Sequence, residues 1–230
     1  MAKKKTQDAS DGMVGGQGSD VTVYLADDHA MVREGLASLL SQDADQFSIV
    51  GQSGDGLVVC DEVKRLQPQV LVLDITMPSL NGLDVCRDIV KRCPHTNVLI
   101  LSMHSDPQFI VRAIEYGAKG YLLKESATTQ LHEAVSTVAG GNLYFGPGIP
   151  ADIMEQVTTS QEDPYERLTN RERQVFQLIA EGKTNRNIAK KLDLSVKTVE
   201  THRTRLMNKL GIHDQITLVK YAIRKGIVIV

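Results

Sequence analysis

The most restrictive feature of this sequence is that four strand-like apolar runs each end on a residue suited to phosphoryl chemistry. The runs are 21–26, 70–73, 98–101 and 121–123, and they end on Asp27-Asp28, Asp74, Ser102 and Lys124, respectively. In a parallel α/β sheet the carboxyl ends of the strands meet at one crevice, so residues far apart in the sequence become neighbours there. We therefore expect a pocket that gathers carboxylates, a hydroxyl and an amine.

The segments between and after these runs predict helices, because apolar residues recur in them at three- and four-residue spacing. These segments are 30–40, 56–66, 83–92, 107–116 and 127–139. Alternation of strand and helix implies right-handed crossovers and a parallel sheet that is covered on both faces. The expected fold is α/β, a doubly wound five-stranded parallel sheet in which the weak strand 47–51 lies at an edge.

The residue types at the strand ends match acyl phosphate chemistry. Mg²⁺ prefers hard oxygen ligands, so carboxylates beside an accessible phosphate site suit it. Asp74 would be the acceptor, because a carboxylate can attack a phosphoryl group once the charge on the phosphoryl oxygens is neutralised. Lys124 and the cation would neutralise this charge, and the Ser102 hydroxyl would donate a hydrogen bond to one phosphoryl oxygen. Any one of these residues could equally be an ordinary strand end, but the set together favours a functional pocket.

Residues 21–140 resemble a bacterial response-regulator receiver domain. The resemblance is carried by Asp27-Asp28, Asp74-Ile75-Thr76-Met77-Pro78, Gly82, Ser102 and Gly120-Tyr121-Leu122-Leu123-Lys124. It implies that Asp74 is the phosphoacceptor and that Mg²⁺ is held by Asp27, Asp28, Asp74 and the backbone carbonyl of Thr76. It also implies that Ser102, Tyr121 and Lys124 sense the phosphate, with the hydroxyl drawn toward it and the ring turning inward. The alternative is that Ser102 only caps its turn and Tyr121 only packs.

Charge divides the chain into two parts. Residues 164–230 hold 14 Lys and Arg against 6 Asp and Glu, whereas residues 1–163 hold 12 against 22. A basic module of this size suggests a polyanionic partner, although a solvated basic surface is the common alternative. The arrangement of the charges must decide between the two.

Capping residues predict four short helices in this basic part, ending at about residues 181, 192, 210 and 225. Thr169 and Glu172 form a capping box, in which each side chain satisfies a free backbone amide at the start of the first helix. Thr184 and Ser195 can cap the second and third helices. We expect an all-α four-helix helix-turn-helix domain over residues 165–230.

This module resembles the LuxR-type helix-turn-helix. The resemblance is carried by Leu168-Thr169-Asn170-Arg171-Glu172, Gly182-Lys183-Thr184-Asn185, Ile188-Ala189, Leu192, Ser195, Thr198-Val199, His202 and Lys209-Leu210. Joined to a receiver, it makes the chain similar to the NarL/FixJ-type transcriptional response regulators, in which 195–210 would be the recognition helix. Residues placed nearest base edges would be Glu200, Thr201 and Thr204, and those placed for backbone contacts would be Asn185, Lys197, His202, Arg205 and Lys209. Phosphate contacts would fix position and base contacts would choose sequence.

Three positions leave alternatives open. His202 could equally be a half-buried packing residue. Asn187 stands where a Glu often completes the capping box of the second helix. Glu200 places a negative charge toward DNA, where it could accept a hydrogen bond from cytosine N4 or point along the groove, so the base preference stays open.

The remaining segments predict a tail and a linker. Residues 1–20 indicate a disordered tail, and 141–164 indicate a linker with a short helical candidate over 149–157. The sequence has no apolar run of eighteen residues and no apolar segment behind its N-terminal lysines. Neither a membrane span nor export is indicated, and we expect a cytoplasmic protein. The three cysteines indicate reduced thiols rather than a disulfide framework or a zinc site.

The resulting hypothesis is a two-component response regulator. A sensor histidine kinase would phosphorylate Asp74, and the phosphorylated protein would form a homodimer on double-stranded DNA. In the resting state the receiver would restrain the recognition helix. Candidate pairing surfaces are the first and last receiver helices, 30–40 and 127–139, and the final helix, including Leu218 and Tyr221, although core packing explains many of these residues equally well. We expect no enzyme activity beyond self-phosphorylation and self-dephosphorylation at Asp74.

Three other classes of protein compete with this hypothesis. A hydrolase of external substrates is disfavoured, because Thr76 stands where such an enzyme would carry an acid/base Asp. A protein-binding receiver with an incidental basic tail would show no salt-sensitive duplex binding. A DNA binder that ignores phosphorylation would leave the pocket without a use.

Overall fold

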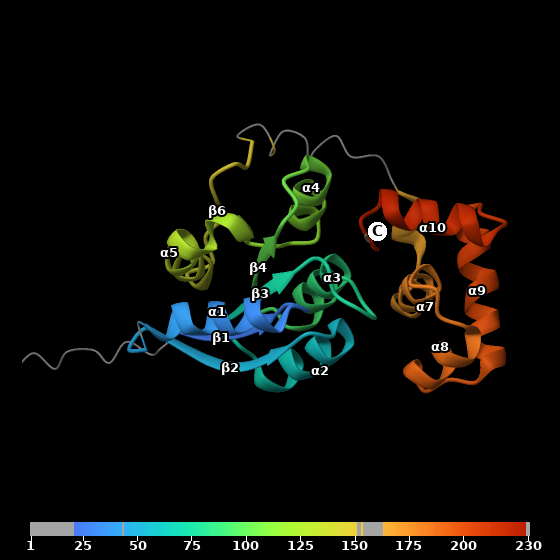
Figure 1. Ribbon diagram of the computed structural model, residues 1–230, viewed down its shortest axis with the longest axis horizontal. Helices are drawn as coiled ribbons and strands as arrows, with labels where there is room; N and C mark the ends of the chain where they lie inside the picture. Colours follow the sequence, from blue (N-terminus) through green and yellow to red (C-terminus); the bar gives the residue numbers. More distant parts are fainter. Residues whose placement is uncertain (1–20, 43, 151–152, 154–162, 229–230) are drawn as a thin grey trace, which may run out of the picture.

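The computed structural model describes residues 21–42, 44–150, 153 and 163–228 of the chain (Figure 1). Residues 21–150, called here the α/β domain, contain a six-stranded sheet in the order β2-β1-β3-β4-β5-β6, with every neighbouring pair parallel. The strands are β1 (Val21–Ala26), β2 (Phe47–Ser53), β3 (Val70–Asp74), β4 (Asn97–Ser102), β5 (Gly120–Leu123) and β6 (Tyr144–Phe145). Parallel neighbours need long crossover connections, which the helices of this domain supply.

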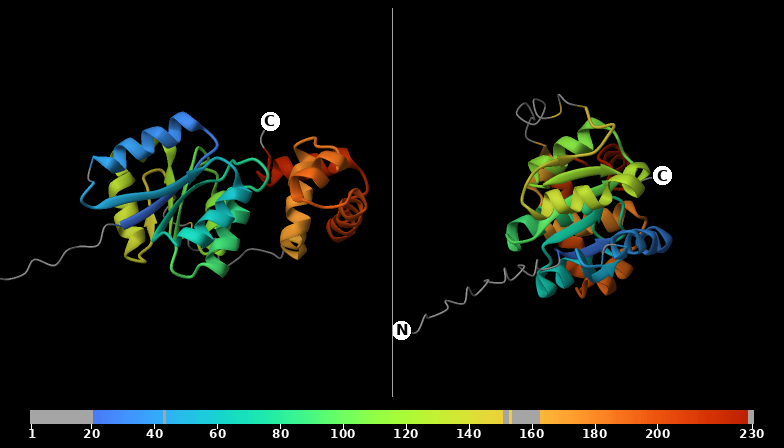
Figure 2. Two further views of the ribbon diagram at one scale, coloured as in Figure 1. Left: turned by 90° about the horizontal axis from the view of Figure 1, so that it is seen from below. Right: turned by 90° about the vertical axis from the view of Figure 1, so that its left-hand side faces the viewer.

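Helices cover both faces of this sheet. They are α1 (Ala30–Ser41), α2 (Gly56–Leu66), α3 (Gly82–Arg92), α4 (Pro107–Glu115) and α5 (Ala127–Ala139), together with the 3-10 turn η1 (Lys124–Ser126). Helices α1 and α5 bury Leu36 and Leu131 against one face, whereas α2, α3 and α4 bury residues such as Val59 and Ile89 against the other (Figure 2). Burial on both faces explains why β3 and β4 are continuous apolar runs rather than alternating ones.

The sheet confirms the predicted parallel α/β fold and differs from the prediction by one short edge strand. Strand β2 lies at one edge, as expected for the weak run 47–51. Strand β6 lies at the other edge, within the range predicted as a linker, and pairs with β5 through Gly120 and Tyr144. Tyr144 joins the apolar cluster of α1 and α5, and Phe145 joins that of α2, α3 and α4. A strand of two residues is too short to be recognised from periodicity.

Residues 163–228, called here the helical domain, confirm the predicted all-α architecture. The elements are η2 (Pro164–Arg167), α7 (Asn170–Ala180), α8 (Asn185–Leu192), α9 (Val196–Leu210) and α10 (Gln215–Arg224). The capping box of Thr169 and Glu172 is present, and the Ser195 side chain accepts from the Thr198 amide at the start of α9. Gly211, with φ of 64°, ends α9 in the left-handed region that favours glycine.

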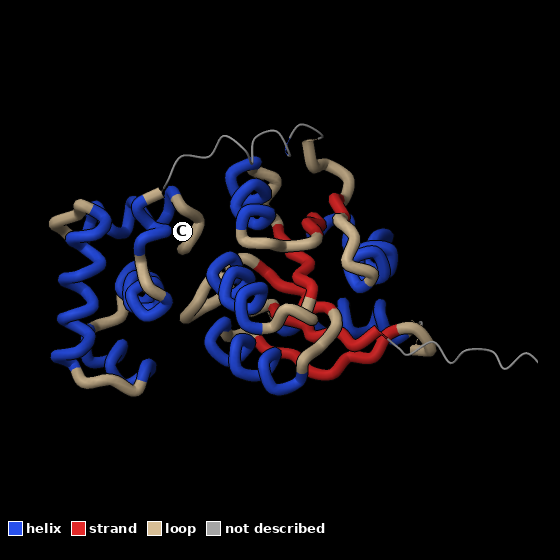
Figure 3. The backbone as a smooth tube through the Cα atoms, turned by 180° about the vertical axis from the view of Figure 1, so that it is seen from behind, coloured by secondary structure: helices blue, strands red, loops and turns tan. Residues whose placement is uncertain are grey.

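The two domains pack together through η2, α7, α8 and the residues after α10 on the helical side. Helix α7 lies beside the α/β domain, and α9 lies on the far side of the helical domain (Figures 1 and 3). The predicted restraint of the recognition helix by the receiver stays a prediction, and it would have to act without direct packing on α9, because the docked helix is α7.

Two predicted segments lie outside the described residues: the N-terminal tail 1–20 and most of the helical candidate 149–157. Among the residues that the structure describes, no helix is long and apolar enough to cross a membrane.

Candidate phosphoacceptor site and nucleic-acid interface

An acidic pocket lies at the carboxyl ends of β1, β3 and β5. Asp27 follows β1, Asp74 ends β3, and Lys124 follows β5. The Nζ atom of Lys124 is 2.6 Å from Oδ2 of Asp27 and 3.0 Å from Oδ2 of Asp74. Asp27 and Asp74 are buried, whereas Asp28 is exposed at the rim. The sheet thus brings together the strand-end residues whose convergence the sequence predicts.

The donors in this pocket fit a hard divalent cation. Asp27, Asp28, His29 and Asp74 each offer one ligand atom, and these atoms all lie within 4.8 Å of one another. Carboxylate oxygens are the ligands that Mg²⁺ prefers. His29 was not predicted as a member of this group, although its position directly after two aspartates was a usable signal; its Nδ1 atom lies 2.7 Å from Oδ1 of Asp28.

Burial sets the electrostatics of the pocket. The pKa of Asp74 is raised from 3.8 to about 6: burial and the neighbouring Asp27 raise it, and Lys124 and the Thr76 amide offset part of this increase. Burial also opposes the charge on Lys124, but the two carboxylates outweigh it and raise the pKa of that ammonium above its usual value. A cation in the pocket would favour the ionised Asp74 that a nucleophile requires.

The backbone beside Asp74 is packed too closely for a side chain. A Cβ at Gly82 would lie 1.9 Å from the Asp74 carbonyl oxygen. The Gly82 amide donates a hydrogen bond to the carbonyl of Ile75 at 2.8 Å. Glycine therefore lets α3 begin directly against the backbone of the candidate phosphoacceptor.

The two predicted switch residues meet at the turn between β4 and α4. Ser102 is fully buried, and its Oγ accepts a hydrogen bond from the His104 amide at 3.1 Å. The Tyr121 hydroxyl donates to the His104 carbonyl oxygen at 2.7 Å. The Tyr121 ring is already buried while the Asp74 carboxylate pairs with Lys124.

The second candidate site is the outer surface of α9. Its exposed side chains include the predicted DNA-facing residues Lys197, Glu200, Thr201, Thr204 and Arg205. The hydroxyls of Thr201 and Thr204 donate to the carbonyls of Lys197 and Glu200, at 2.9 and 3.0 Å. The predicted base-reading residues therefore share one solvent-facing surface of the helix.

Three residues predicted to contact the DNA backbone are less accessible. Lys209 donates to Oε2 of Glu172 at 2.6 Å and to the Arg167 carbonyl at 3.1 Å, which ties α9 to the capping box of α7. His202 is half-buried and its Nδ1 atom is shielded from solvent, which favours the packing interpretation. Asn185 is half-buried at the first position of α8.

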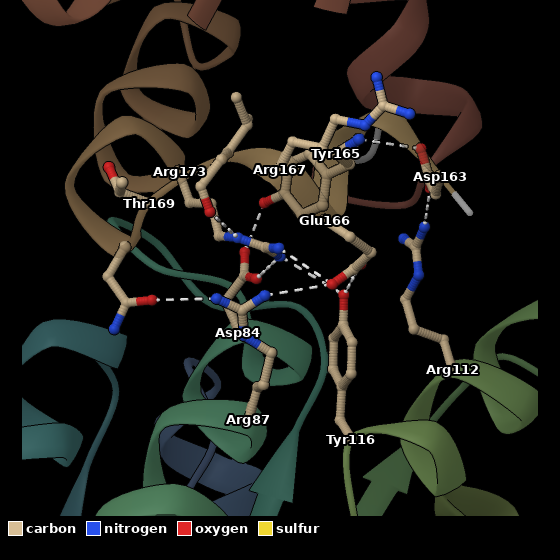
Figure 4. Close-up of polar contacts among 12 residues, drawn as sticks. Asp84, Arg87, Arg112, Tyr116, Asp163, Tyr165, Glu166, Arg167, Thr169 and Arg173 are labelled. Atoms are coloured by element: carbon tan, nitrogen blue, oxygen red, sulfur yellow. Dashed lines mark hydrogen bonds and ion pairs between the residues drawn. The ribbon is translucent and has the colours of Figure 1, made fainter. Parts of the chain in front are cut away.

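The residues that join the two domains were not predicted from the sequence. Arg173 of α7 is 1% exposed, and its Nη1 atom is 2.6 Å from Oδ1 of Asp84 on α3 (Figure 4). Asp163 lies 2.5 Å from both Arg112 of α4 and Lys225 at the end of α10. Charged residues at helix surfaces carry no sequence signal for the particular partner that they bind.

Comparisons with known proteins match both domains. The family described as response regulator receiver domain matches residues 23–136, and the luxR family of bacterial regulatory proteins matches residues 166–222. The oxygen regulatory protein NreC of Staphylococcus carnosus (strain TM300) is 38% identical over 211 residues, which cover 88% of this chain and 97% of the relative. The transcriptional regulatory protein MctR of Rhizobium johnstonii is 36% identical over 208 residues, covering 90% and 95%.

Solved structures agree with these matches. A structure of the RcsB response regulator of Salmonella typhimurium aligns with a TM-score of 0.54 at 27% identity, covering 88% of this chain and 97% of that one. A structure of two RcsB dimers bound to two parallel DNAs aligns with a TM-score of 0.53 at 27% identity, covering 88% and 98%.

Proposed function

This chain belongs to the NarL/FixJ-type two-component response regulators, which join a receiver domain to a LuxR-type DNA-binding domain and regulate transcription, and we propose that phosphorylation of Asp74 controls its binding to DNA. The observation that carries this proposal is the buried Asp74, whose carboxylate shares the Lys124 ammonium with Asp27, in a chain that also presents the exposed surface of α9. Sequence-specific binding would place Glu200, Thr201 and Thr204 near base edges.

The proposed reaction transfers a phosphoryl group to Asp74 from the phosphohistidine of a sensor kinase. A carboxylate oxygen of Asp74 forms the new P–O bond, the P–N bond of the phosphohistidine breaks, and the imidazole leaves. Lys124 lies where it can stabilise charge on the phosphoryl oxygens, and Ser102 supplies a hydroxyl at the adjacent strand end. Mg²⁺ held by Asp27, Asp28, Asp74 and the Thr76 carbonyl would neutralise further charge on the transferred group. Water attack on the acyl phosphate ends the signal, so turnover is confined to Asp74 itself.

Pairing of two phosphorylated chains is the proposed route to a two-fold DNA site. The exposed apolar residues of α10 are Ile216, which is 70% exposed, and Ile223, which is 40% exposed. The earlier candidates Leu218 and Tyr221 face inward: Leu218 is fully buried, and Tyr221 is half-buried with its hydroxyl 2.7 Å from Asp163. We place the pairing surface on the outer side of α10 and the protein in the cytoplasm, where its proposed kinase and DNA partners meet.

The test combines phosphorylation with DNA binding. The purified protein is incubated with a small phosphodonor and Mg²⁺, and intact-mass spectrometry and peptide mapping locate the modification. Duplex DNA captured from genomic fragments is then titrated with the wild type, with Asp74→Asn, and with Asp45→Asn as a matched control. Asp45 is an exposed carboxylate on the turn before β2, at the opposite end of the sheet from the pocket.

We expect the wild type and Asp45→Asn to gain about 80 Da at Asp74 and to bind specific DNA more tightly after phosphorylation, because one phosphoryl group is added. Asp74→Asn should do neither. An unmodified Asp74, or equal DNA affinity with and without the phosphodonor, would reject the proposal.

A further inference from the structure

Helix α7 of the helical domain holds the loop that follows the phosphoacceptor. The Gln177 Nε2 atom donates to the Met77 carbonyl at 2.8 Å, and its Oε1 atom accepts from the Asn81 amide at 2.6 Å. The Glu181 Oε1 atom accepts from the Ser79 amide at 3.0 Å and from Gln177 Nε2 at 2.9 Å. Two side chains of the DNA-binding domain thus satisfy three backbone groups of the β3–α3 loop, three to seven residues after Asp74.

This loop has an unusual backbone conformation. Ser79 has a φ of 73°, a value that a non-glycine residue rarely adopts, and its side chain is fully buried. Its hydroxyl donates to Oδ2 of Asp55 at 2.6 Å. Such a conformation persists only where surrounding contacts hold it, and here one of those contacts comes from Glu181, the residue that caps the C-terminus of α7.

A buried ion pair fixes α7 in register with the loop. Arg173 lies one turn before Gln177, contacts Asp84 at the start of α3, and stacks on the Tyr165 ring with a centroid distance of 4.2 Å. Its Nη2 atom lies 3.1 Å from Glu166, which also accepts from the Tyr116 hydroxyl of α4 (Figure 4). Arg173 therefore orients α7, and Gln177 and Glu181 follow on the same face of the helix.

We propose that Gln177 and Glu181 are positioning residues of the phosphorylation site, supplied by the DNA-binding domain, and that they hold the β3–α3 loop in the arrangement in which Lys124 pairs with Asp74. The inference rests on the proposed function and adds a direct structural connection between the DNA-binding domain and the phosphorylation site. This connection does not involve Ser102 or Tyr121, and the Tyr121 ring is already buried in this arrangement.

Thermodynamic linkage between the two domains determines the direction of the expected change in phosphoryl binding. If the contacts from α7 stabilise the loop around the free Asp74 carboxylate, then a phosphoryl group that rearranges the loop must weaken those contacts, and their loss must strengthen phosphoryl binding by the same factor. If a residue only held the domains together and had no effect on the loop, its substitution would leave the affinity of the pocket for a phosphoryl group unchanged.

The test measures the affinity of the full-length protein for beryllofluoride in Mg²⁺ by fluorine NMR. Gln177→Met keeps the length and helix preference of the side chain and removes both hydrogen bonds to the loop. Gln174→Ala is the matched control, because Gln174 lies on the same helix and its hydrogen bond, from Arg171, stays within the helical domain. We expect Gln177→Met to bind beryllofluoride at least about fivefold more tightly than the wild type, a usual size for coupling between sites, and Gln174→Ala to bind as the wild type does.

Two further measurements distinguish a loss of loop positioning from a general loss of folded structure. Glu181→Gln keeps the Oε1 acceptor and should behave as the wild type, whereas Glu181→Ala should shift affinity in the same direction as Gln177→Met. Hydrogen exchange at the Ser79 and Asn81 amides should quicken in Glu181→Ala and Gln177→Met, while the far-UV circular dichroism stays that of the wild type. Unchanged or weaker beryllofluoride binding by Gln177→Met would overturn the inference and leave the proposed function standing. A wild type that binds no beryllofluoride would reject the proposed function itself.

Discussion

The buried carboxylate of Asp74 should make this protein less stable than it could be. Burial raises its pKa from 3.8 to about 6, a value that already includes the attraction of Lys124. Because a pKa unit corresponds to about 1.4 kcal/mol, the ionised side chain lowers the free energy of unfolding by roughly 3 kcal/mol at pH 7. Asp74→Asn keeps the shape of the side chain and removes the charge, so we expect it to recover most of this free energy.

The stability difference between the wild type and Asp74→Asn should depend on pH in a defined direction. The folded pKa of Asp74 is raised, so the wild type loses stability relative to the Asn variant as the pH rises from the usual carboxyl pKa through about 6. The advantage of Asp74→Asn should therefore be largest at pH 7 and fall to about half that value at pH 5.

Urea unfolding in EDTA at both pH values measures this difference. Coincident transitions by circular dichroism and tyrosine fluorescence are required first, because a chain of two domains need not unfold in one step. Asp45→Asn is the control for loss of an exposed carboxylate and should change stability little. Saturating Mg²⁺ should reduce the difference in stability between the wild type and Asp74→Asn. A bound ion at a hundred times its Kd stabilises the folded protein by about 2.7 kcal/mol, and the Asn variant lacks one of the carboxylates that would hold the ion. An Asn variant no more stable than the wild type at pH 7, or an advantage that does not shrink at pH 5, would refute the reasoning.

Three other substitutions test the pocket, the domain contact and the DNA surface. Lys124→Met should slow phosphorylation by a small phosphodonor by about a hundredfold or more, because it removes the positive charge beside Asp74; phosphate-affinity electrophoresis measures the rate, and an unchanged rate would exclude that role. Arg173→Met should weaken docking of the two domains by about 3–5 kcal/mol, because it leaves Asp84 buried without its partner. Small-angle scattering should then give a larger radius of gyration, and an unchanged radius would show that the ion pair is dispensable. Arg205→Ala should weaken duplex binding similarly for all sequences and reduce the slope of log affinity against log salt by about 1, in a fluorescence anisotropy titration; a change confined to one sequence would instead make it a base-reading residue.

The parts of the fold that were predictable depend on local patterns. The parallel sheet followed from apolar runs that alternate with helical periodicity, and the starts of α7 and α9 followed from Thr169 and Ser195, whose side chains cap them in the structure. Strand β6 was missed because Tyr144 and Phe145 form a strand only through the open edge of β5, which is a tertiary effect.

The pocket was predictable to a similar degree, and the domain interface was not. Strand ends of a parallel sheet converge whatever the loops do, so Asp27, Asp74 and Lys124 could be grouped from the sequence alone. Arg173 and Asp84 belong to helices whose relative placement no local pattern determines. Lys209 shows the same limit: the resemblance placed it for contacts with the DNA backbone, which stays a prediction, and no local pattern indicated that it also pairs with Glu172.

The docked arrangement restricts how phosphorylation can act on DNA binding. Helix α7 separates α9 from the α/β domain and is itself about 10 Å across, so charges of that domain lie at least about one Debye length from the DNA-facing surface at 0.1 M salt. Asp74 lies on the other side of the interface and farther still from that surface, so we expect a charge added there to have little direct effect on the attraction of Lys197 or Arg205 for phosphate. Those side chains are already exposed, so the proposed control by phosphorylation would act on how two helical domains are placed relative to each other, and the contacts of α7 with the β3–α3 loop lie where they could influence that placement.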